Sequence, residues 1–134
     1  MPKPRFINPD TLAPPPGYTQ VVEVTGPGRT IYIAGQLGLD IDGKLVGAPG
    51  DFRAQAEQTF KNLKAALAAV GAGFEHIVKV NNYLVDMAHL PILRDVRGAY
   101  FGRENPPAST TVAVSTLARD GALYEIDAIA VLPG

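Results

Sequence analysis

The sequence contains no cysteine, which excludes disulfide bonds, thiolate nucleophiles and thiolate metal sites. Long apolar runs are also missing: no stretch reaches membrane-spanning length, and the N-terminal ten residues lack the apolar core of a signal peptide. Lys and Arg number 12 against 13 Asp and Glu, and no block carries charge of one sign. Nonspecific binding to nucleic-acid phosphates is therefore disfavoured. These absences predict a cytoplasmic protein that binds neither nucleic acid nor membrane.

Motifs that carry chemistry are scarce. His76 and His89 stand thirteen residues apart, without the spacing of a metal-binding helix, so no metal site is expected. Residues 26–30 form a glycine-containing segment that lacks the Gly-Lys-Ser/Thr ending of a phosphate loop. No Gly-x-Ser-x-Gly segment surrounds any serine, so nucleophilic hydrolysis has little support.

The length of 134 residues fits one domain, 1–134, that can bury a single core. Residues 1–17 contain six prolines and predict an extended N-terminal arm with neither helix nor a complete strand ladder. Residues 21–24 and 30–34 are rich in β-formers and flank a glycine-proline turn signal. This pattern predicts that the two segments pair as a hairpin.

A helix is predicted after Asp51, which can cap its N-terminus. Its apolar positions follow three- and four-residue spacing, whereas Gln55 is expected elsewhere on its circumference. Gly71 and Gly73 are expected to end this helix in left-handed conformations. A strand over 75–85 and a helix opened by Pro91 follow, which gives the element order ββαβαββ and an α+β class. The apolar helix positions are Phe52, Ala56, Phe60, Leu63, Leu67 and Val70.

The last strand places two carboxylates among apolar residues. Period-two alternation puts Glu125 and Asp127 on one face and Tyr124, Ile126 and Ala128 on the other. A carboxylate on an apolar sheet surface must be paired, solvated or functional. An ion pair with Lys79 or an arginine is the structural alternative to a role in binding a polar molecule or orienting a water.

Together, five segments resemble the RidA/YjgF family of small enamine and imine deaminase-like proteins, and they span nearly the whole chain. These segments are Gly17-Tyr18, residues 31–36, residues 55–67, residues 77–80 and residues 106–131. The resemblance implies a chorismate-mutase-like α+β fold, a mixed sheet covered by two helices on one face. It also implies a homotrimer whose inter-subunit clefts bind a small-molecule ligand without a cofactor.

The resemblance also implies site residues. In active members an arginine binds the carboxylate of an amino-acid-derived imine, and a glutamate helps to hold the attacking water. Glu125 matches the glutamate, whereas Ser109 stands where the arginine is found. Tyr18, Gly35 and Thr111 match other positions of the binding site.

The serine in place of the arginine affects the expected substrate, since a neutral hydroxyl does not replace a bidentate guanidinium. Arg94 lies near a position that often holds a polar site residue and could restore the charge, although surface solvation explains it equally well. We therefore expect hydrolysis of an imine or enamine other than the simple amino-acid-derived ones. The alternatives are a catalytically silent trimeric binding protein and a ribonuclease or translation inhibitor, which the balanced charge disfavours.

Overall fold

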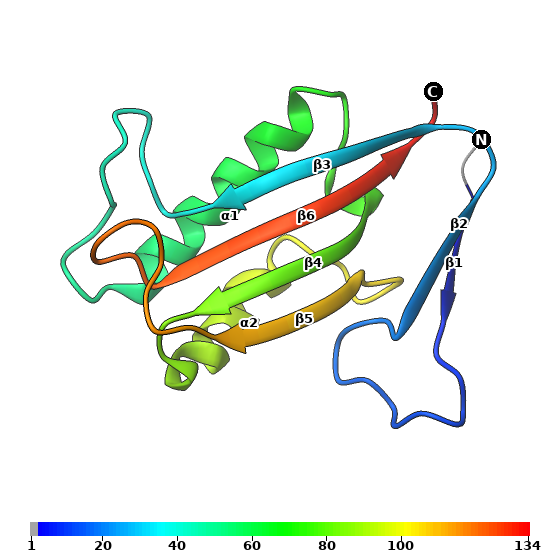
Figure 1. The fold of residues 1–134 in the computed structure, drawn as a ribbon, viewed down its shortest axis with the longest axis horizontal. Coiled ribbons are helices and arrows are strands. Elements are labelled where there is room, and N and C mark those ends of the chain that lie inside the picture. The colour runs from blue at the N-terminus through cyan, green and yellow to red at the C-terminus, as the bar shows by residue number, and fades with distance from the viewer. Residues whose placement is uncertain (1–2) are drawn as a thin grey trace.

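The computed structural model describes residues 3–134, which form two β-sheets and two α-helices (Figure 1). The main sheet has four strands in the order β3-β6-β4-β5. Strand β4 runs parallel to β5 and antiparallel to β6, so the sheet is mixed. Its strands are β3 (Arg29–Gln36), β4 (Ile77–Leu84), β5 (Ala108–Ala113) and β6 (Tyr124–Leu132).

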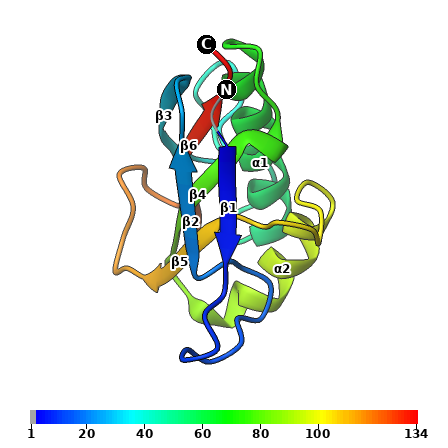
Figure 2. The ribbon, with the colours of Figure 1, turned by 90° about the vertical axis from the view of Figure 1, so that its right-hand side faces the viewer.

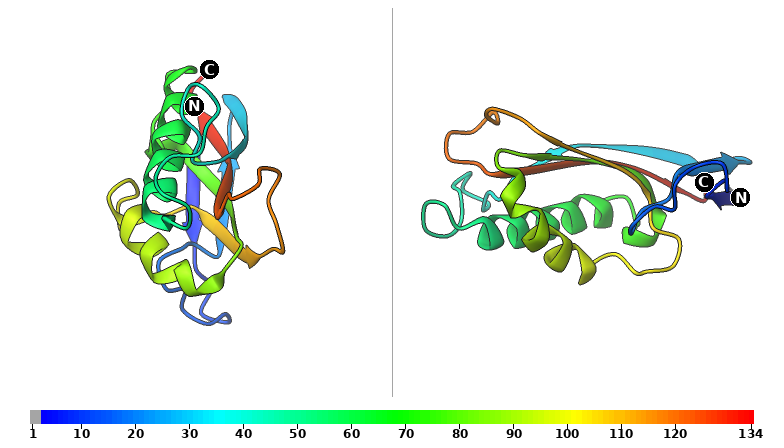
Figure 3. Two further views of the ribbon diagram at one scale, coloured as in Figure 1. Left: turned by 90° about the vertical axis from the view of Figure 1, so that its left-hand side faces the viewer. Right: turned by 90° about the horizontal axis from the view of Figure 1, so that it is seen from below.

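Both α-helices cover the same face of the main sheet and leave the other face open (Figure 3). They are α1 (Phe52–Ala68) and α2 (Leu90–Gly98), each preceded or followed by a short 3₁₀ turn, at Phe74–His76 and Met87–His89. This arrangement confirms the expected α+β fold with two helices on one side of a mixed sheet. No helix in residues 3–134 is long and apolar enough to cross a membrane.

The predicted hairpin between residues 21–24 and 30–34 is wrong. Strand β2 (Val21–Thr25) pairs instead with β1 (Lys3–Ile7) inside the proline-rich arm, as a two-stranded ribbon at the end of the main sheet (Figure 2). Gly26 has a φ of 89°, which lets the chain turn away before β3 begins and pairs with β6. Pro4 has no backbone N–H to donate to a neighbouring strand. The arm nevertheless forms a strand because both strands of a two-stranded ribbon are edge strands, which tolerate proline.

Helix α1 begins where the sequence indicated. Asp51 Oδ1 accepts the backbone N–H of Ala54 at 3.0 Å, and the apolar face packs into the core. Gln55 contradicts the expectation, because it is buried on that face. Its amide donates to the Gly121 carbonyl at 3.1 Å and accepts the Leu123 N–H at 2.8 Å. The side chain is buried because it satisfies the loop that leads into β6.

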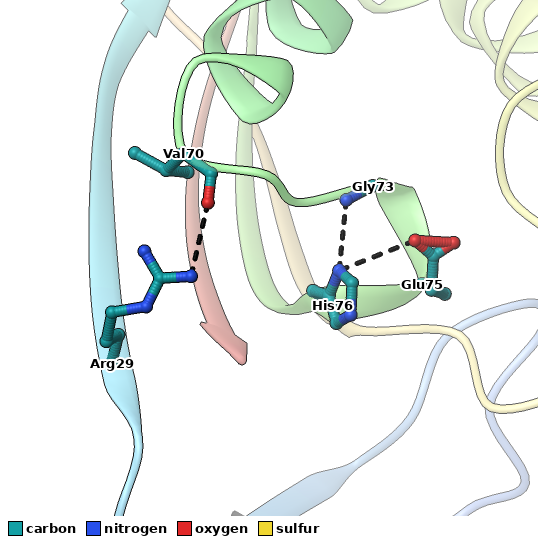
Figure 4. A network of polar contacts seen from close by, with 5 residues as sticks. All are labelled: Arg29, Val70, Gly73, Glu75 and His76. Carbon is teal, nitrogen blue, oxygen red and sulfur yellow. Dashed lines mark hydrogen bonds and ion pairs between the residues drawn. The ribbon is translucent and has the colours of Figure 1, made fainter. Parts of the chain in front are cut away.

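The end of α1 uses only one of the two expected glycines. Gly71 has a φ of 76°, as predicted, whereas Gly73 has no positive φ. The Gly73 N–H donates to His76 Nδ1 at 3.0 Å, and a Glu75 oxygen lies 3.4 Å from the same nitrogen (Figure 4). Arg29 at the start of β3 donates to the Val70 carbonyl at 3.3 Å. This bond fastens the first strand of the main sheet to the end of the helix.

Strand β6 confirms the expected alternation. Tyr124, Ile126 and Ala128 are buried beneath the helices, while Glu125 and Asp127 are half-buried on the open face. The central position of β6, between β3 and β4, fixes both faces of this strand. The two carboxylates therefore project from the middle of the sheet, away from the helices.

Candidate functional site

Glu125 and Gly35 are brought together on the open face. The pairing of β4 with β6 sets Glu125 opposite Tyr83, and the carboxylate extends the other way, over β3. A Cβ placed on Gly35 would collide with Oε2 of Glu125 and lie 2.6 Å from its Cδ. The register of β3 against β6 shifts between Ile33 and Gln36, at this point of contact. Glycine at position 35 thus makes room for the glutamate.

The two carboxylates of β6 differ in their partners. Asp127 accepts hydrogen bonds from Asn81 Nδ2 at 2.8 Å and from the Tyr83 hydroxyl at 2.9 Å. Within residues 3–134, Glu125 has neither a hydrogen bond to its side chain nor an ion pair. Lys79, the expected alternative partner, donates instead to Thr110 Oγ1 at 2.9 Å. The Glu125 carboxylate is therefore available to a bound molecule.

The surroundings of Glu125 favour its protonated form. Burial raises the pKa of its carboxyl group, and the negative charge of Asp127 raises it further. The hydrogen bond to Asp127 likewise raises the pKa of Tyr83. A carboxylate with a raised pKa is a stronger base than an ordinary glutamate and accepts a proton from water more readily.

Ser109 and Thr111 lie on the other side of the sheet, facing the helices. The parallel register pairs Ser109 with Val80 and Thr111 with Asn82, which is buried. Asn82 Nδ2 donates to Ser109 Oγ at 3.2 Å and to Thr111 Oγ1 at 3.3 Å, and the Tyr124 hydroxyl donates to Asn82 Oδ1 at 2.6 Å. Since both hydroxyl oxygens act as acceptors here, their own O–H groups are free to donate elsewhere.

A cavity of about 390 Å³ opens beside Ser109. Arg94 of α2 also lines it, so the structure places two of the predicted site residues together. Arg97 and Arg103 line it as well, and sequence reasoning missed both. The spacing of Arg94 and Arg97, three residues apart on one helix face, is a signal that could have identified the second. The other lining residues are Gly17, Val80, Gly98, Phe101, Gly102, Pro106 and Pro107.

The end of the arm forms part of the rim of this cavity. The Thr19 N–H donates to the Pro107 carbonyl at 3.2 Å, and the Thr19 hydroxyl donates to the Pro106 carbonyl. A Cβ placed on Gly17 would lie 3.6 Å from Arg97 Nη2. Tyr18, between Gly17 and Thr19, is half-buried and is not among the residues that line the cavity.

The predicted site residues thus form two groups separated by the main sheet. Glu125 and Gly35 lie on the open face, whereas Ser109, Thr111 and Arg94 lie on the helix side. The part of the chain that the structure describes contains no cluster of three or more acidic or histidine side chains that could hold a metal ion. The chemistry available to this site is that of a carboxylate base, hydroxyl donors and guanidinium groups.

Residues 9–132 match the family described as Endoribonuclease L-PSP. Protein DfrA of Myxococcus xanthus is 43% identical over 114 residues, which cover 85% of this chain and 84% of that protein. A 2-iminobutanoate/2-iminopropanoate deaminase of Dermatophagoides farinae is 36% identical, with 96% and 98% covered. The mouse protein of the same name is 41% identical, with 85% and 80% covered.

Solved structures agree with these relatives. The crystal structure of YyfB, a Rid-family protein of Yersinia pestis, has a TM-score of 0.85 and 36% identity, covering 96% of this chain and 98% of that one. RidA from an Antarctic Psychrobacter species has a TM-score of 0.71 and 35% identity, with 96% and 99% covered. The chain therefore belongs to the Endoribonuclease L-PSP family, the RidA/YjgF family that its sequence resembles.

Proposed function

We propose that this protein hydrolyses a reactive imine or enamine and releases ammonia, with Glu125 holding the attacking water. The observation that carries the proposal is the Glu125 carboxylate, which lies against Gly35 and has no polar side-chain partner within residues 3–134. The relatives named 2-iminobutanoate/2-iminopropanoate deaminase, at 36% and 41% identity, support the class of reaction.

The reaction requires only a base and a water molecule. The water oxygen bonds to the carbon of the C=N group, the π electrons move to nitrogen, and Glu125 takes a proton from the water. Transfer of that proton to nitrogen gives a neutral carbinolamine, and Glu125 then passes the hydroxyl proton to the same nitrogen, which makes it an ammonium leaving group. The C–N bond then breaks as the C=O bond forms, so one imine and one water give one carbonyl compound and one ammonia. No cofactor takes part.

The complete site in this proposal is a cleft between two copies of the chain. Because the sheet separates Glu125 from the cavity beside Ser109, a ligand in that cavity meets the Glu125 of a neighbouring copy. The open face suits such an assembly, since Tyr32 is 78% exposed and Val112 is 39% exposed on it. A cyclic homotrimer, as the family resemblance implies, would contain three equivalent clefts.

Ser109 directs the proposal away from simple amino-acid-derived imines. It carries no charge, and its oxygen already accepts a hydrogen bond from Asn82. A substrate with a single carboxylate therefore finds no guanidinium at position 109 with which to form a bidentate pair. The same observation favours a second candidate function, a trimeric protein that binds a metabolite without converting it.

Ammonia release from freshly generated amino-acid imines tests the proposal, with wild type, Ser109→Arg and a no-protein control compared under identical conditions. We expect Ser109→Arg to exceed the wild type by about 30-fold or more, because a charge-assisted pair contributes roughly 2–5 kcal/mol. That result would show that the protein activates water and that Ser109 directs it to a substrate other than these imines. If neither protein accelerates release from these imines or from imines that carry a second negative charge, the binding-only function replaces the proposal.

A further inference from the structure

Three arginines line the cavity beside α2, and none of them has an acidic partner within residues 3–134. Arg94 and Arg97 come from one face of α2, and Arg103 comes from the loop that follows it. The nearest acid in sequence on α2, Asp95, is already paired with Arg53 at 2.8 Å. The cavity therefore holds a concentration of positive charge that the protein itself leaves uncompensated.

Arg97 is the most enclosed of these groups. It is half-buried, and burial lowers the pKa of its guanidinium, with the charge of Arg94 lowering it further. A guanidinium stays charged in proteins, so burying it beside a like charge is unfavourable unless an anion compensates. One carboxylate would balance only one of the charges. The arrangement suits a group with two negative charges.

The rest of the cavity adds a donor and an apolar wall. The Ser109 hydroxyl accepts from Asn82, which leaves its O–H free to donate to an anionic oxygen in the cavity. Val80, Phe101 and the adjacent prolines supply apolar surface. The volume of about 390 Å³ falls within the usual range for small-molecule sites.

We infer that this cavity binds a small organic dianion, a phosphate monoester or a dicarboxylate, whose head group contacts Arg94, Arg97, Arg103 and Ser109 while its apolar part packs on Phe101. The inference deepens the proposed function, because the same ligand would carry the imine or enamine toward Glu125 of the neighbouring copy. In place of one arginine at position 109, the chain uses two from α2 and one from the following loop.

Titration calorimetry on the full chain at pH 7.5 tests the inference with three probes. Phenyl phosphate and phthalate are aromatic dianions that represent the two sources of charge, and benzoate is the matched monoanion. We expect at least one dianion to bind about ten-fold or more tightly than benzoate. Tighter binding of phenyl phosphate would assign a phosphate ester, and tighter binding of phthalate a dicarboxylate. Equal affinities for all three probes, or no binding of either dianion at millimolar concentration, would overturn the inference.

Arginine variants locate the bound anion. Arg94→Gln, Arg97→Gln and Arg103→Gln should each weaken binding of the preferred dianion by about ten-fold. Arg119→Gln is the matched control, since Arg119 is exposed and its guanidinium donates to the Gly43 carbonyl outside the cavity. It removes the same charge and should leave affinity within about two-fold. Equal losses in all four variants would show a general charge effect and contradict the assigned site.

Arg97→Lys and Glu125→Gln, together with the melting temperature of Arg103→Gln, separate folding and catalysis from binding. Arg97→Lys retains the charge and should retain part of the affinity, while Arg103→Gln alters an exposed loop residue and should leave the melting temperature unchanged. Glu125→Gln should still bind the dianion. In the wild type, binding of the dianion without ammonia release from an imine that carries the same dianionic group would support the cavity assignment while contradicting the proposed hydrolysis, so the two failures are distinguishable.

Discussion

Replacing Glu125 with glutamine is expected to lower kcat/KM for ammonia release by about 10²–10⁴-fold, the usual contribution of a positioned general base. The amide has the size of the carboxylate and still accepts a hydrogen bond from water, but it takes no proton at neutral pH. The measurement is initial-rate ammonia release by wild type and Glu125→Gln on the same freshly generated imine. Equal rates would remove Glu125 from the mechanism.

The stability of this variant is the accompanying control. The ordinary pKa of the glutamate is 4.5, and burial beside Asp127 raises it in the folded protein. Folding therefore favours the protonated group, and its contribution to stability is fully present below pH 4.5 and is lost as the pH rises through the folded pKa. At pH 7 the glutamine variant should melt no lower than the wild type. A lower melting temperature together with lost activity would indicate structural damage instead.

Gly35→Ala is expected to lower kcat by about 10²-fold, because the new methyl group occupies the space of the Glu125 carboxylate. The group that must move is the end of a flexible side chain, so the melting temperature should change little. Steady-state rates and thermal melting of the single variant test this directly. Unchanged kcat with an intact fold would show that the position of the carboxylate is irrelevant.

A double variant tests whether Gly35→Ala lowers kcat by displacing Glu125. In the Glu125→Gln background, Gly35→Ala should cause no further large loss, because the base that it displaces is already inactive. A second loss of about 10²-fold on top of the first would instead mean that Gly35 acts independently, through its own backbone contact with the ligand.

Local patterns predicted the elements but not all of their partners. The cap at Asp51 and the alternation along β6 depend on neighbouring residues, and the structure confirms both. The pairing of β3 with β6 joins residues about a hundred positions apart, and no local signal distinguishes it from a hairpin with β2. Gln55 is buried because a distant loop needs its amide, which helical spacing alone does not reveal.

In the candidate site, too, the sequence pointed to individual residues but not to their arrangement in space. The resemblance suggested Glu125, Gly35, Ser109 and Arg94 individually. Only the folded chain sets the first two on the open face and brings Ser109 of β5 to the same cavity as Arg94 of α2. Arg103 joins the cavity only because the loop after α2 folds back toward β5. That all three arginines line one cavity therefore became visible only in three dimensions.

The most direct test of the account is ammonia release by hybrid assemblies of two variants that are each inactive alone. One is Glu125→Gln, and the other is Gly98→Trp, which places an indole on a cavity-lining position of α2 that has open space around it. In the proposed homotrimer, random mixing on co-expression would leave about one quarter of the clefts with an intact cavity from one copy and an intact Glu125 from its neighbour. If the two halves of each cleft come from neighbouring copies, about one quarter of wild-type activity is expected to return. Activity that stays at the level of the separate variants would contradict the account.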